Sequence, residues 1–249
     1  MELQGRNVLI TGAAQRIGRE IALALARRGA TILIHSRKSR KEAVELREEI
    51  ESLGSEALLF SADFSWARKP LLPMIKNFVK GLYRKVPRVD VLVNNAALFY
   101  PTPFGKISEK DWDNFLTVNL KAPFFLAQEI GVRMVKQGAG KIINLVDWTA
   151  LRPSVNYLPY AISKAGLAAA TQGLAKALAP QVQVLSIAPG PILPAKGATP
   201  KAAKAIAQKT LLKRYGAPRD IAATIRFFIE DTDFITGAFL PVVGGAHIA

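Results

Sequence analysis

The sequence predicts an α/β protein with a doubly wound, seven-stranded and mostly parallel sheet, with helices on both faces. Seven short segments that are almost wholly apolar alternate with helical segments along the chain. Strands that are apolar on both sides are typical of parallel sheets covered by helices on both faces. No repeat, linker or change of composition interrupts the alternation, so residues 1–249 are expected to form a single domain.

The first part of the chain is expected to supply four strands. A strand at 8–10 is followed by a helix over 17–28 that ends at Gly29, because glycine is favoured at helix C-termini. The elements that follow are a strand at 31–34, an amphipathic helix over 41–53, a strand at 57–60, a helical stretch whose first turn holds Pro70 and Pro73 or is broken by them, and a strand at 89–93.

The second part is expected to supply three more strands. The elements are a long helix over 111–137, a strand at 141–146, an Ala-rich helix over 157–178, a strand at 182–187, helices over 201–213 and 218–230, and a strand at 238–242. Residues 189–200 contain four prolines and two glycines, which predicts a loop. We expect the segment 189–213 to cover a substrate as a lid.

Composition limits the possible functions. The chain has a net charge of +15 and no cysteine, so disulfides and cysteine-bound metals are excluded, and no metal site is expected. The charge favours anionic partners: a phosphorylated cofactor, an acidic carrier protein, a polyanionic substrate or nucleic acid. A nucleic-acid partner is not expected, because no repeat of basic and aromatic residues occurs. Neither a signal peptide nor a membrane span is recognisable, which predicts a cytoplasmic protein without a membrane partner.

A glycine-bearing turn follows the first strand and predicts a Rossmann-type dinucleotide site. Gly12 allows the backbone to approach a phosphate group, and Gly18 allows the helix to pack closely on the strand. The N-terminus of the next helix then presents free N–H groups to the pyrophosphate. The residues of this turn expected to bind the cofactor are Thr11, Gly12, Arg16, Ile17 and Gly18.

The end of the second strand indicates which cofactor is bound. NAD sites place a carboxylate there for the ribose 2′-hydroxyl, but this strand ends in His35, Ser36 and Arg37, followed by Lys38 and Ser39. Cations and hydroxyls suit a 2′-phosphate, so we expect NADPH, bound by His35, Ser36 and Arg37. Lys38 could instead belong to a solvated basic loop.

Tyr160 and Lys164 are four residues apart, which places them on one face of a helix. A nearby ammonium favours the phenolate and so acts to lower the phenol pKa, which would suit proton transfer by Tyr160. Burial acts on the same pKa, and the sequence does not decide the net shift. Asp147 lies thirteen residues upstream of Tyr160, and Asn119 precedes both. We expect Asn119, Asp147, Tyr160 and Lys164 to be the catalytic residues.

Over essentially its full length the chain resembles the short-chain dehydrogenase/reductase family. The matching residues are Thr11, Gly12, Gly18, Asp63, Asn94, Asn95, Ala96, Asn119, Tyr160, Lys164, Pro189 and Gly190. The resemblance implies that Asp63 and Phe64 lie by the adenine, that Asn94 to Ala96 line the cofactor site, and that Lys164 bonds the nicotinamide ribose. Tyr160, Pro189 and Gly190 are likewise implied to contact the cofactor. It also implies that Tyr160 donates a proton, that Asn119 holds a relay water, and that the protein is a homotetramer.

Departures from the family pattern point to one branch of it. Arg16 replaces the middle glycine of the first turn, and Asp147 stands where the family has a catalytic serine. Together with Phe99, these residues resemble the pteridine reductase branch. That resemblance implies that Phe99 stacks on a pterin and that Arg16 reaches substrate and cofactor phosphates. Asp147, Trp148 and Tyr160 complete the expected substrate site. Phe99 could instead pack in the core, and Asp147 could merely cap the strand end.

Asp147 also favours one reaction on chemical grounds. A carboxylate repels a developing oxyanion, whereas reduction of a ring C=N bond requires a proton at nitrogen. We therefore expect an NADPH-dependent oxidoreductase that transfers hydride to a pterin, dihydropterin or dihydrofolate ring. The alternatives are a 3-oxoacyl-(acyl carrier protein) reductase, which the +15 charge also suits, another NADPH-dependent carbonyl reductase, or a non-enzymatic NADPH-binding sensor or scaffold.

Overall fold

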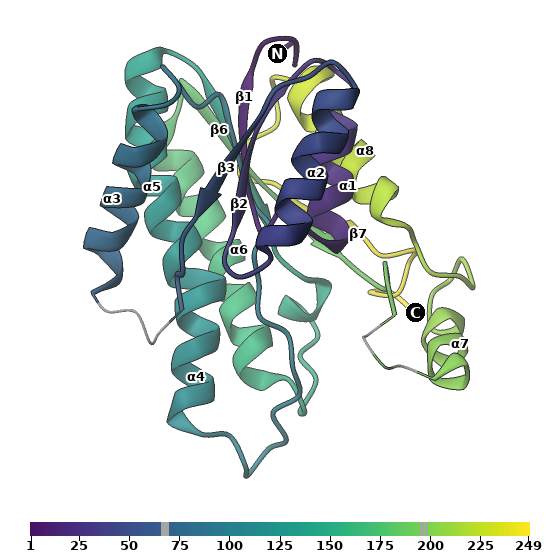
Figure 1. The fold of residues 1–249 in the computed structure, drawn as a ribbon. Helices are drawn as coiled ribbons and strands as arrows, with labels where there is room; N and C mark the ends of the chain where they lie inside the picture. Colours follow the sequence, from purple (N-terminus) through teal and green to yellow (C-terminus); the bar gives the residue numbers. More distant parts are fainter. Residues whose placement is uncertain (66–69, 195–196, 198) are drawn as a thin grey trace.

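The computed structural model describes residues 1–65, 70–194, 197 and 199–249, and its strands form one sheet (Figure 1). Their order is β3-β2-β1-β4-β5-β6-β7, and every pairing between them is parallel. The strands are β1 (Asn7–Thr11), β2 (Thr31–Ser36), β3 (Ala57–Ser61), β4 (Val91–Asn94), β5 (Gly140–Leu145), β6 (Val182–Pro189) and β7 (Phe239–Val242). The predicted doubly wound α/β fold is confirmed, with a sheet that is wholly rather than mostly parallel.

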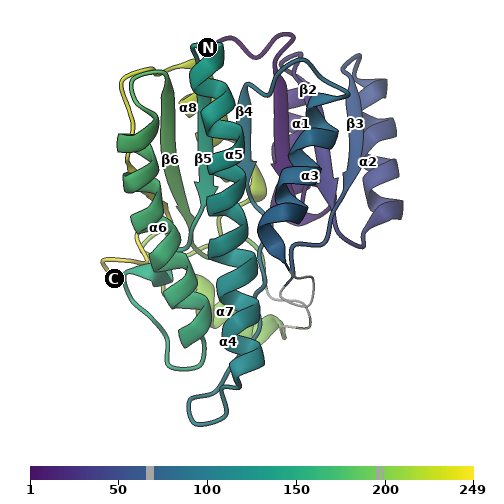
Figure 2. The same ribbon diagram turned by 90° about the vertical axis from the view of Figure 1, so that its left-hand side faces the viewer.

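Helices cover both faces of the sheet (Figures 1 and 2). One face packs against α1 (Arg16–Ala26), α2 (Arg40–Ser52) and α8 (Pro218–Glu230), and the other against α3 (Leu71–Tyr83), α5 (Ala122–Gln137) and α6 (Leu158–Leu178). Successive strand side chains point to opposite faces, so Ile10 joins the first core cluster and Leu9 the second. This is why the strands are apolar throughout.

The helix expected over 111–137 is divided in the structure. It consists of α4 (Glu109–Leu116), a π-helical turn (Thr117–Lys121) and α5. Pro123 has no N–H to donate to the carbonyl of Asn119, four residues earlier, so the regular hydrogen-bond ladder is interrupted there. Single π turns inside helices are frequent at functional sites, and this one contains Asn119.

The helix expected over 201–213 is shorter, because α7 spans only Pro200–Gln208. The Thr210 hydroxyl donates to the Ala207 carbonyl at 2.9 Å and accepts the Arg214 amide at 3.2 Å. Lys213 then adopts a left-handed backbone with φ 54°. These bonds replace a further helical turn. The predicted loop over 189–200 includes residues 195, 196 and 198, which lie outside the described residues.

The order of the strands determines where a ligand can bind. Chain connections leave β1 and β4 in opposite directions along the sheet, so a crevice opens beyond the carboxyl ends of these two neighbouring strands. The glycine-bearing turn follows β1, and Asn95 follows β4. Both are therefore placed at the same edge.

Candidate functional site

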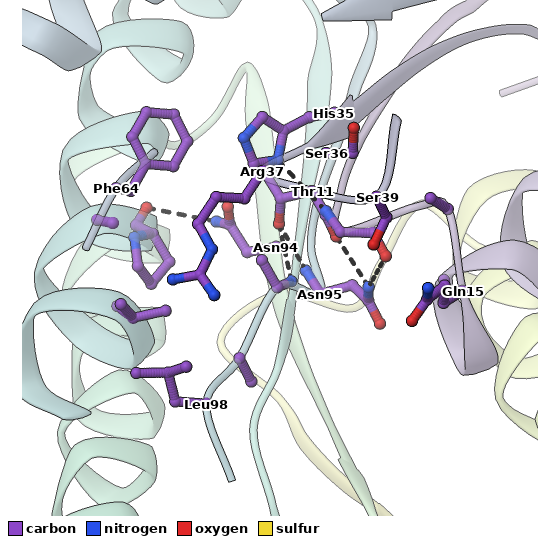
Figure 3. A pocket seen from close by; sticks show the side chains of 18 of the residues that line it. Thr11, Gln15, His35, Ser36, Arg37, Ser39, Phe64, Asn94, Asn95 and Leu98 are labelled. Carbon is purple, nitrogen blue, oxygen red and sulfur yellow. Dashed lines mark hydrogen bonds between the residues drawn. The ribbon is translucent and has the colours of Figure 1, made fainter. Parts of the chain in front are cut away.

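A cleft of about 460 Å³ lies at this edge of the sheet (Figure 3). It is lined by most residues expected to bind the cofactor: Thr11, Gly12, Arg16, Ile17, Gly18, His35, Ser36, Arg37, Phe64, Asn95 and Ala96. The lining does not include Asp63, Tyr160, Lys164, Pro189 or Gly190. The cleft is thus made chiefly by the ends of β1, β2 and β4 and the segments after them.

The turn after β1 is fixed tightly against the end of β4. Two backbone amides, of Asn95 and Ala96, donate to the Thr11 hydroxyl at 3.0 Å. The Asn95 side chain donates to the carbonyls of Thr11 and Gly12 at 2.8 and 3.0 Å. A Cβ on Gly18 would lie 2.4 Å from the Gly12 carbonyl oxygen, so any side chain there would displace the turn. The glycines leave the backbone bare where a pyrophosphate would approach.

The N-terminus of α1 can receive an anion. Gln15, at the N-cap, makes no capping hydrogen bond. Its side-chain Nε2 donates instead to the Glu42 carboxylate at 2.5 Å. The first turn of the helix has no acidic residue. Free N–H groups and the positive end of the helix dipole therefore face the cleft, as binding of a pyrophosphate requires.

Arg37 provides a positive charge beside the cleft (Figure 3). Its guanidinium is partly exposed and lies 4.0 Å from Asp63, whose carboxylate also accepts the Ser65 amide at 3.0 Å. Ser36, Lys38 and Ser39 line the cleft nearby, and in the described part of the chain no carboxylate does. Cations and hydroxyls in this position fit a ribose 2′-phosphate.

His35 lines the cleft but does not add to this charge. Burial lowers the pKa of His35 to about 4, although a hydrogen bond to Ala62 and the charge of Asp63 oppose the shift. The Gly12 amide donates to its Nδ1 at 3.3 Å, and its Nε2 lies 3.2 Å from the Ala62 carbonyl oxygen. The ring is therefore neutral at pH 7 and holds the glycine-bearing turn in place.

We expect Arg37→Gln to weaken NADPH binding by ~10- to 100-fold, because a charge-assisted contact to the 2′-phosphate is lost. NADH, which lacks this phosphate, should bind within about twofold of its wild-type affinity. Fluorescence titration with both cofactors measures the two dissociation constants. Arg40→Gln removes the same charge outside the cleft lining and is the matched control. Equal losses for NADPH and NADH would show that Arg37 does not read the phosphate.

Tyr160 and Asp147 form the centre of the expected catalytic group. The Tyr160 hydroxyl donates to Asp147 Oδ2 at 2.7 Å, and Thr149 donates twice to Oδ1, from its amide at 2.8 Å and its hydroxyl at 2.7 Å. Asp147 thus caps the 3-10 turn Trp148–Ala150 with one oxygen and holds the phenol with the other. The capping role weighed from the sequence is therefore present, and a role of Asp147 in the reaction stays a prediction.

The net shift of the phenol pKa, which the sequence left open, is upward. Burial raises the pKa of Tyr160 well above its ordinary value, and the charge and hydrogen bond of Asp147 raise it further. Lys164 does not reverse the shift, since its ammonium donates to the Leu145 carbonyl at 2.6 Å and lies 6.0 Å from the centre of the Tyr160 ring. Tyr160 is therefore a protonated phenol at neutral pH.

Lys164 is itself perturbed. Burial lowers its pKa to about 8, with Asp147 opposing part of the shift. An amine with this pKa is mostly protonated at pH 7 and neutral at pH 9, whereas an exposed lysine keeps its charge throughout.

We expect kcat/KM for NADPH to fall as the pH rises through about 8, because Lys164 loses its proton there in the free enzyme. Below this pH the ammonium is present and the rate is at its plateau. Steady-state rates between pH 6 and pH 10 test this, with Lys164→Arg as the companion variant, since a guanidinium stays charged over the range. An alkaline limb that persists unchanged in Lys164→Arg would assign it to another group.

Asn119 is completely buried beneath the site. Its side-chain oxygen accepts the Leu98 amide at 2.8 Å, and its Nδ2 donates to the Leu98 carbonyl at 3.1 Å and to Ser163 at 3.2 Å. These bonds tie the π turn to the segment after β4. The relay water that the family resemblance implies at Asn119 stays a prediction.

Phe99 connects the cleft to the catalytic group. The residue is 57% exposed, which excludes the alternative that it packs in the core. One face stacks on Tyr157, with ring centres 4.9 Å apart and planes 5° from parallel, and Tyr160 meets the ring edge-on at 4.9 Å. Trp148, also expected at the substrate site, is half-buried in the turn after Asp147. Phe99 therefore offers aromatic surface between the cofactor cleft and Tyr160.

Three supporting residues were not predicted: Thr149 holds Asp147, Tyr157 stacks on Phe99, and Ser163 bonds Asn119. Thr149 could have been found, since an Asp followed two residues later by Thr is typical of a side-chain-bonded turn. Gly190, expected at the cofactor, has a structural reason as well, because a Cβ there would lie 2.8 Å from the Cα of Val243. Pro189 ends β6 at the same edge of the sheet.

This fold and this site define a dinucleotide-binding oxidoreductase. Residues 6–204 match the family described as short chain dehydrogenase, and the chain belongs to that family.

Curated relatives and solved structures with different names are similar to this chain. The 3-oxoacyl-(acyl-carrier-protein) reductase FabG of Thermotoga maritima is 33% identical over 252 residues, covering 100% of both chains. FabG of Staphylococcus epidermidis is 30% identical, covering 98% of this chain and 99% of its own. FolM alternative dihydrofolate reductase 1 of Brucella suis, in complex with NADP, is 31% identical with a TM-score of 0.90, covering 100% of this chain and 97% of its own. The Brucella canis protein, also with NADP, has a TM-score of 0.89 at 30% identity, with the same coverage.

Proposed function

We propose that this protein is an NADPH-dependent reductase that transfers hydride to a pterin, dihydropterin or dihydrofolate ring. The observation that supports the proposal best is the hydrogen bond of 2.7 Å from Tyr160 to Asp147, beside the exposed ring of Phe99. The dihydrofolate reductases from Brucella, whose structures superpose over the whole chain, support it independently.

The proposed cofactor is NADPH, in agreement with the cationic end of β2 and with the NADP complexes of the Brucella proteins. Thr11, Gly12, Gly18 and the N-terminus of α1 would hold the pyrophosphate, and Arg37 the 2′-phosphate. When bound, the nicotinamide would supply a hydride to a carbon of the ring's C=N bond, and the ring nitrogen would need a proton. The remaining steps are performed by residues of this chain.

Tyr160 is suited to supply the proton that the ring nitrogen requires. Its phenol remains protonated at neutral pH because burial and Asp147 raise its pKa. Asp147 orients the hydroxyl and is itself fixed by Thr149. A carboxylate this close to a carbonyl oxygen would repel the negative charge that develops there during ketone reduction, whereas it does not oppose protonation of a nitrogen. Phe99 would hold the flat ring by stacking.

A second candidate is a 3-oxoacyl-(acyl carrier protein) reductase, which the FabG relatives favour. Asp147 in place of the family's usual serine and the exposed Phe99 oppose it. Asp147 also opposes reduction of other carbonyl substrates, because its carboxylate would repel the developing oxyanion there too.

The decisive assay is oxidation of NADPH with dihydrobiopterin, dihydrofolate and an acetoacetyl thioester side by side, followed by nicotinamide absorbance. We expect turnover with a pterin or folate and none with the thioester. Turnover with the thioester alone would refute the proposal, and would mean that Asp147 replaces the serine in ordinary ketone reduction.

Assembly and location are proposed from the family pattern and from composition. We infer a cytoplasmic homotetramer without a membrane or nucleic-acid partner, which light scattering and cell fractionation test. Among the described residues, no helix has both the length and the apolar character that crossing a bilayer demands.

A further inference from the structure

One of the cationic stretches of the chain begins shortly after the end of β6. Residues 199–219, which we call the basic segment, contain six cations and no acidic residue, and so account for +6 of the net +15. The six are Lys201, Lys204, Lys209, Lys213, Arg214 and Arg219. Only Lys201 and Lys204 lie within α7, and like charges three residues apart do not stabilise a helix.

The basic segment is not neutralised by neighbouring carboxylates. No acidic partner of its six cations occurs among the described residues; Lys213 and Arg214 donate to backbone carbonyls instead, those of Gln208 and Tyr215. The other strongly charged helix, α2, is different, because Lys41 pairs with Glu45 and Arg47 with Glu51. Two cations of α2 are therefore paired within their own helix, whereas no described carboxylate pairs with the cations of the basic segment.

The basic segment lies beside the site. Two backbone hydrogen bonds attach the segment to the loops after β6 and β7. The Gly216 amide donates to the Pro191 carbonyl at 2.9 Å, and the Leu212 amide donates to the Gly244 carbonyl at 3.2 Å. Just before the segment, the Pro194 carbonyl accepts the Arg16 guanidinium at 3.3 Å, and Arg16 lines the cofactor cleft.

The helix of the basic segment stands clear of the core. No residue of α7 is buried, and Figure 1 shows α7 away from the sheet at the end of the molecule where α4 also lies. Lys201 and Lys204, three residues apart on α7, share a face and are both exposed. The segment thus presents exposed cations on a helix that has no buried residue.

We propose that the basic segment binds an anionic extension of the substrate, a chain of carboxylates such as the γ-linked glutamates that folates can bear. This inference rests on the proposed function and narrows it to substrates whose ring is joined to a polycarboxylate tail. A flexible tail can follow spaced lysines without a preformed pocket, and each carboxylate adds a modest attraction that salt screens. A globular acidic partner would need a complementary surface of about 800 Å² on this side, which one isolated helix does not offer.

The test compares dihydrofolate bearing one glutamate with dihydrofolate bearing five, using the full chain and NADPH. We expect KM to be about tenfold lower for the pentaglutamate at low salt, and the advantage to disappear at about 0.5 M salt. In the triple variant Lys201→Gln/Lys204→Gln/Lys209→Gln the ratio of the two KM values should fall to about 1. The control Lys76→Gln/Lys80→Gln/Lys136→Gln removes the same charge from exposed positions on α3 and α5 and should keep the ratio. Equal KM values in the wild type, or equal losses in both triple variants, would overturn the proposal.

A binding measurement separates this proposal from the reaction itself. Fluorescein-labelled penta-γ-glutamate is titrated with the NADP-loaded protein and followed by anisotropy, which requires no turnover. Salt-sensitive binding that the Lys201/Lys204/Lys209 variant loses supports the tail site even if no pterin is reduced. Absence of binding overturns the proposal. A lower KM for an acyl-carrier-protein thioester than for the free thioester would also overturn it, if the difference depends on the same lysines. Failure of the pterin assay alone refutes only the proposed function.

Discussion

Replacing Tyr160 by phenylalanine is expected to lower kcat about a thousandfold, because the phenol is the proton donor and general acids typically contribute factors of this size. NADPH should still bind with its affinity changed by no more than about threefold, since Tyr160 is not among the residues that line the cofactor cleft. Single-turnover rates and NADPH fluorescence measure the two quantities separately, with whichever substrate the wild type reduces.

Tyr83→Phe is the matched control for this prediction. Its hydroxyl is buried at the end of α3 and belongs neither to the cleft lining nor to the catalytic group, so the same chemical change there should not affect turnover. If Tyr160→Phe kept more than about a tenth of the wild-type rate, another group would have to supply the proton, and Asp147 would be the first candidate.

Gly18→Ala is expected to have the largest effect on the cofactor site. The added Cβ would lie 2.4 Å from the Gly12 carbonyl and 2.6 Å from Asn95 Nδ2, and backbone cannot yield as the end of a side chain can. We expect the free energy of unfolding to fall by about 1–3 kcal/mol, as in overpacked cores. NADPH affinity should fall by more than about tenfold, because the turn that receives the pyrophosphate is displaced. Urea denaturation and NADPH titration measure these effects.

Gly173→Ala makes the same change where there is room for it. Gly173 is exposed within α6, and a Cβ there would meet nothing within 4 Å. This variant should be more stable by about 0.4–1 kcal/mol, because alanine restricts the unfolded chain. If both glycine variants bound NADPH as the wild type does, close packing at Gly18 would not shape the cofactor site.

The sheet could be predicted from the sequence because hydrophobic burial on both faces of a parallel sheet produces a signal in every strand. Leu9 and Ile10, for example, face opposite sides of the sheet and are both buried, and this is visible as a local run of apolar residues in the sequence. The division of the helix at Asn119 could not be predicted in this way. It depends on a missing backbone N–H at Pro123 and on bonds to Leu98, which is distant in sequence.

The positions of the candidate site residues in the fold could be predicted better than their electrostatics. The spacing of Tyr160 and Lys164 placed them correctly on one helix, and the end of β2 indicated the cationic side of the cleft. The sign of the pKa shift at Tyr160 was not accessible, because it depends on burial and on an aspartate brought within 2.7 Å by the fold. Lys164 was expected to act on the phenol. Its ammonium instead donates a hydrogen bond to the carbonyl of Leu145, the last residue of β5.

Arg16 illustrates how selection for one property would act against another. Its backbone is left-handed, with φ 54°, a conformation that costs a residue other than glycine roughly 1–2 kcal/mol. A laboratory evolution experiment that rewarded only heat resistance would therefore be expected to recover Arg16→Gly early. The recovered variants would be more thermostable, but they would lack the guanidinium at the cleft and its hydrogen bond to the Pro194 carbonyl. Sequencing codon 16 in such a population would show whether the strained backbone at Arg16 is kept because ligand binding requires its side chain.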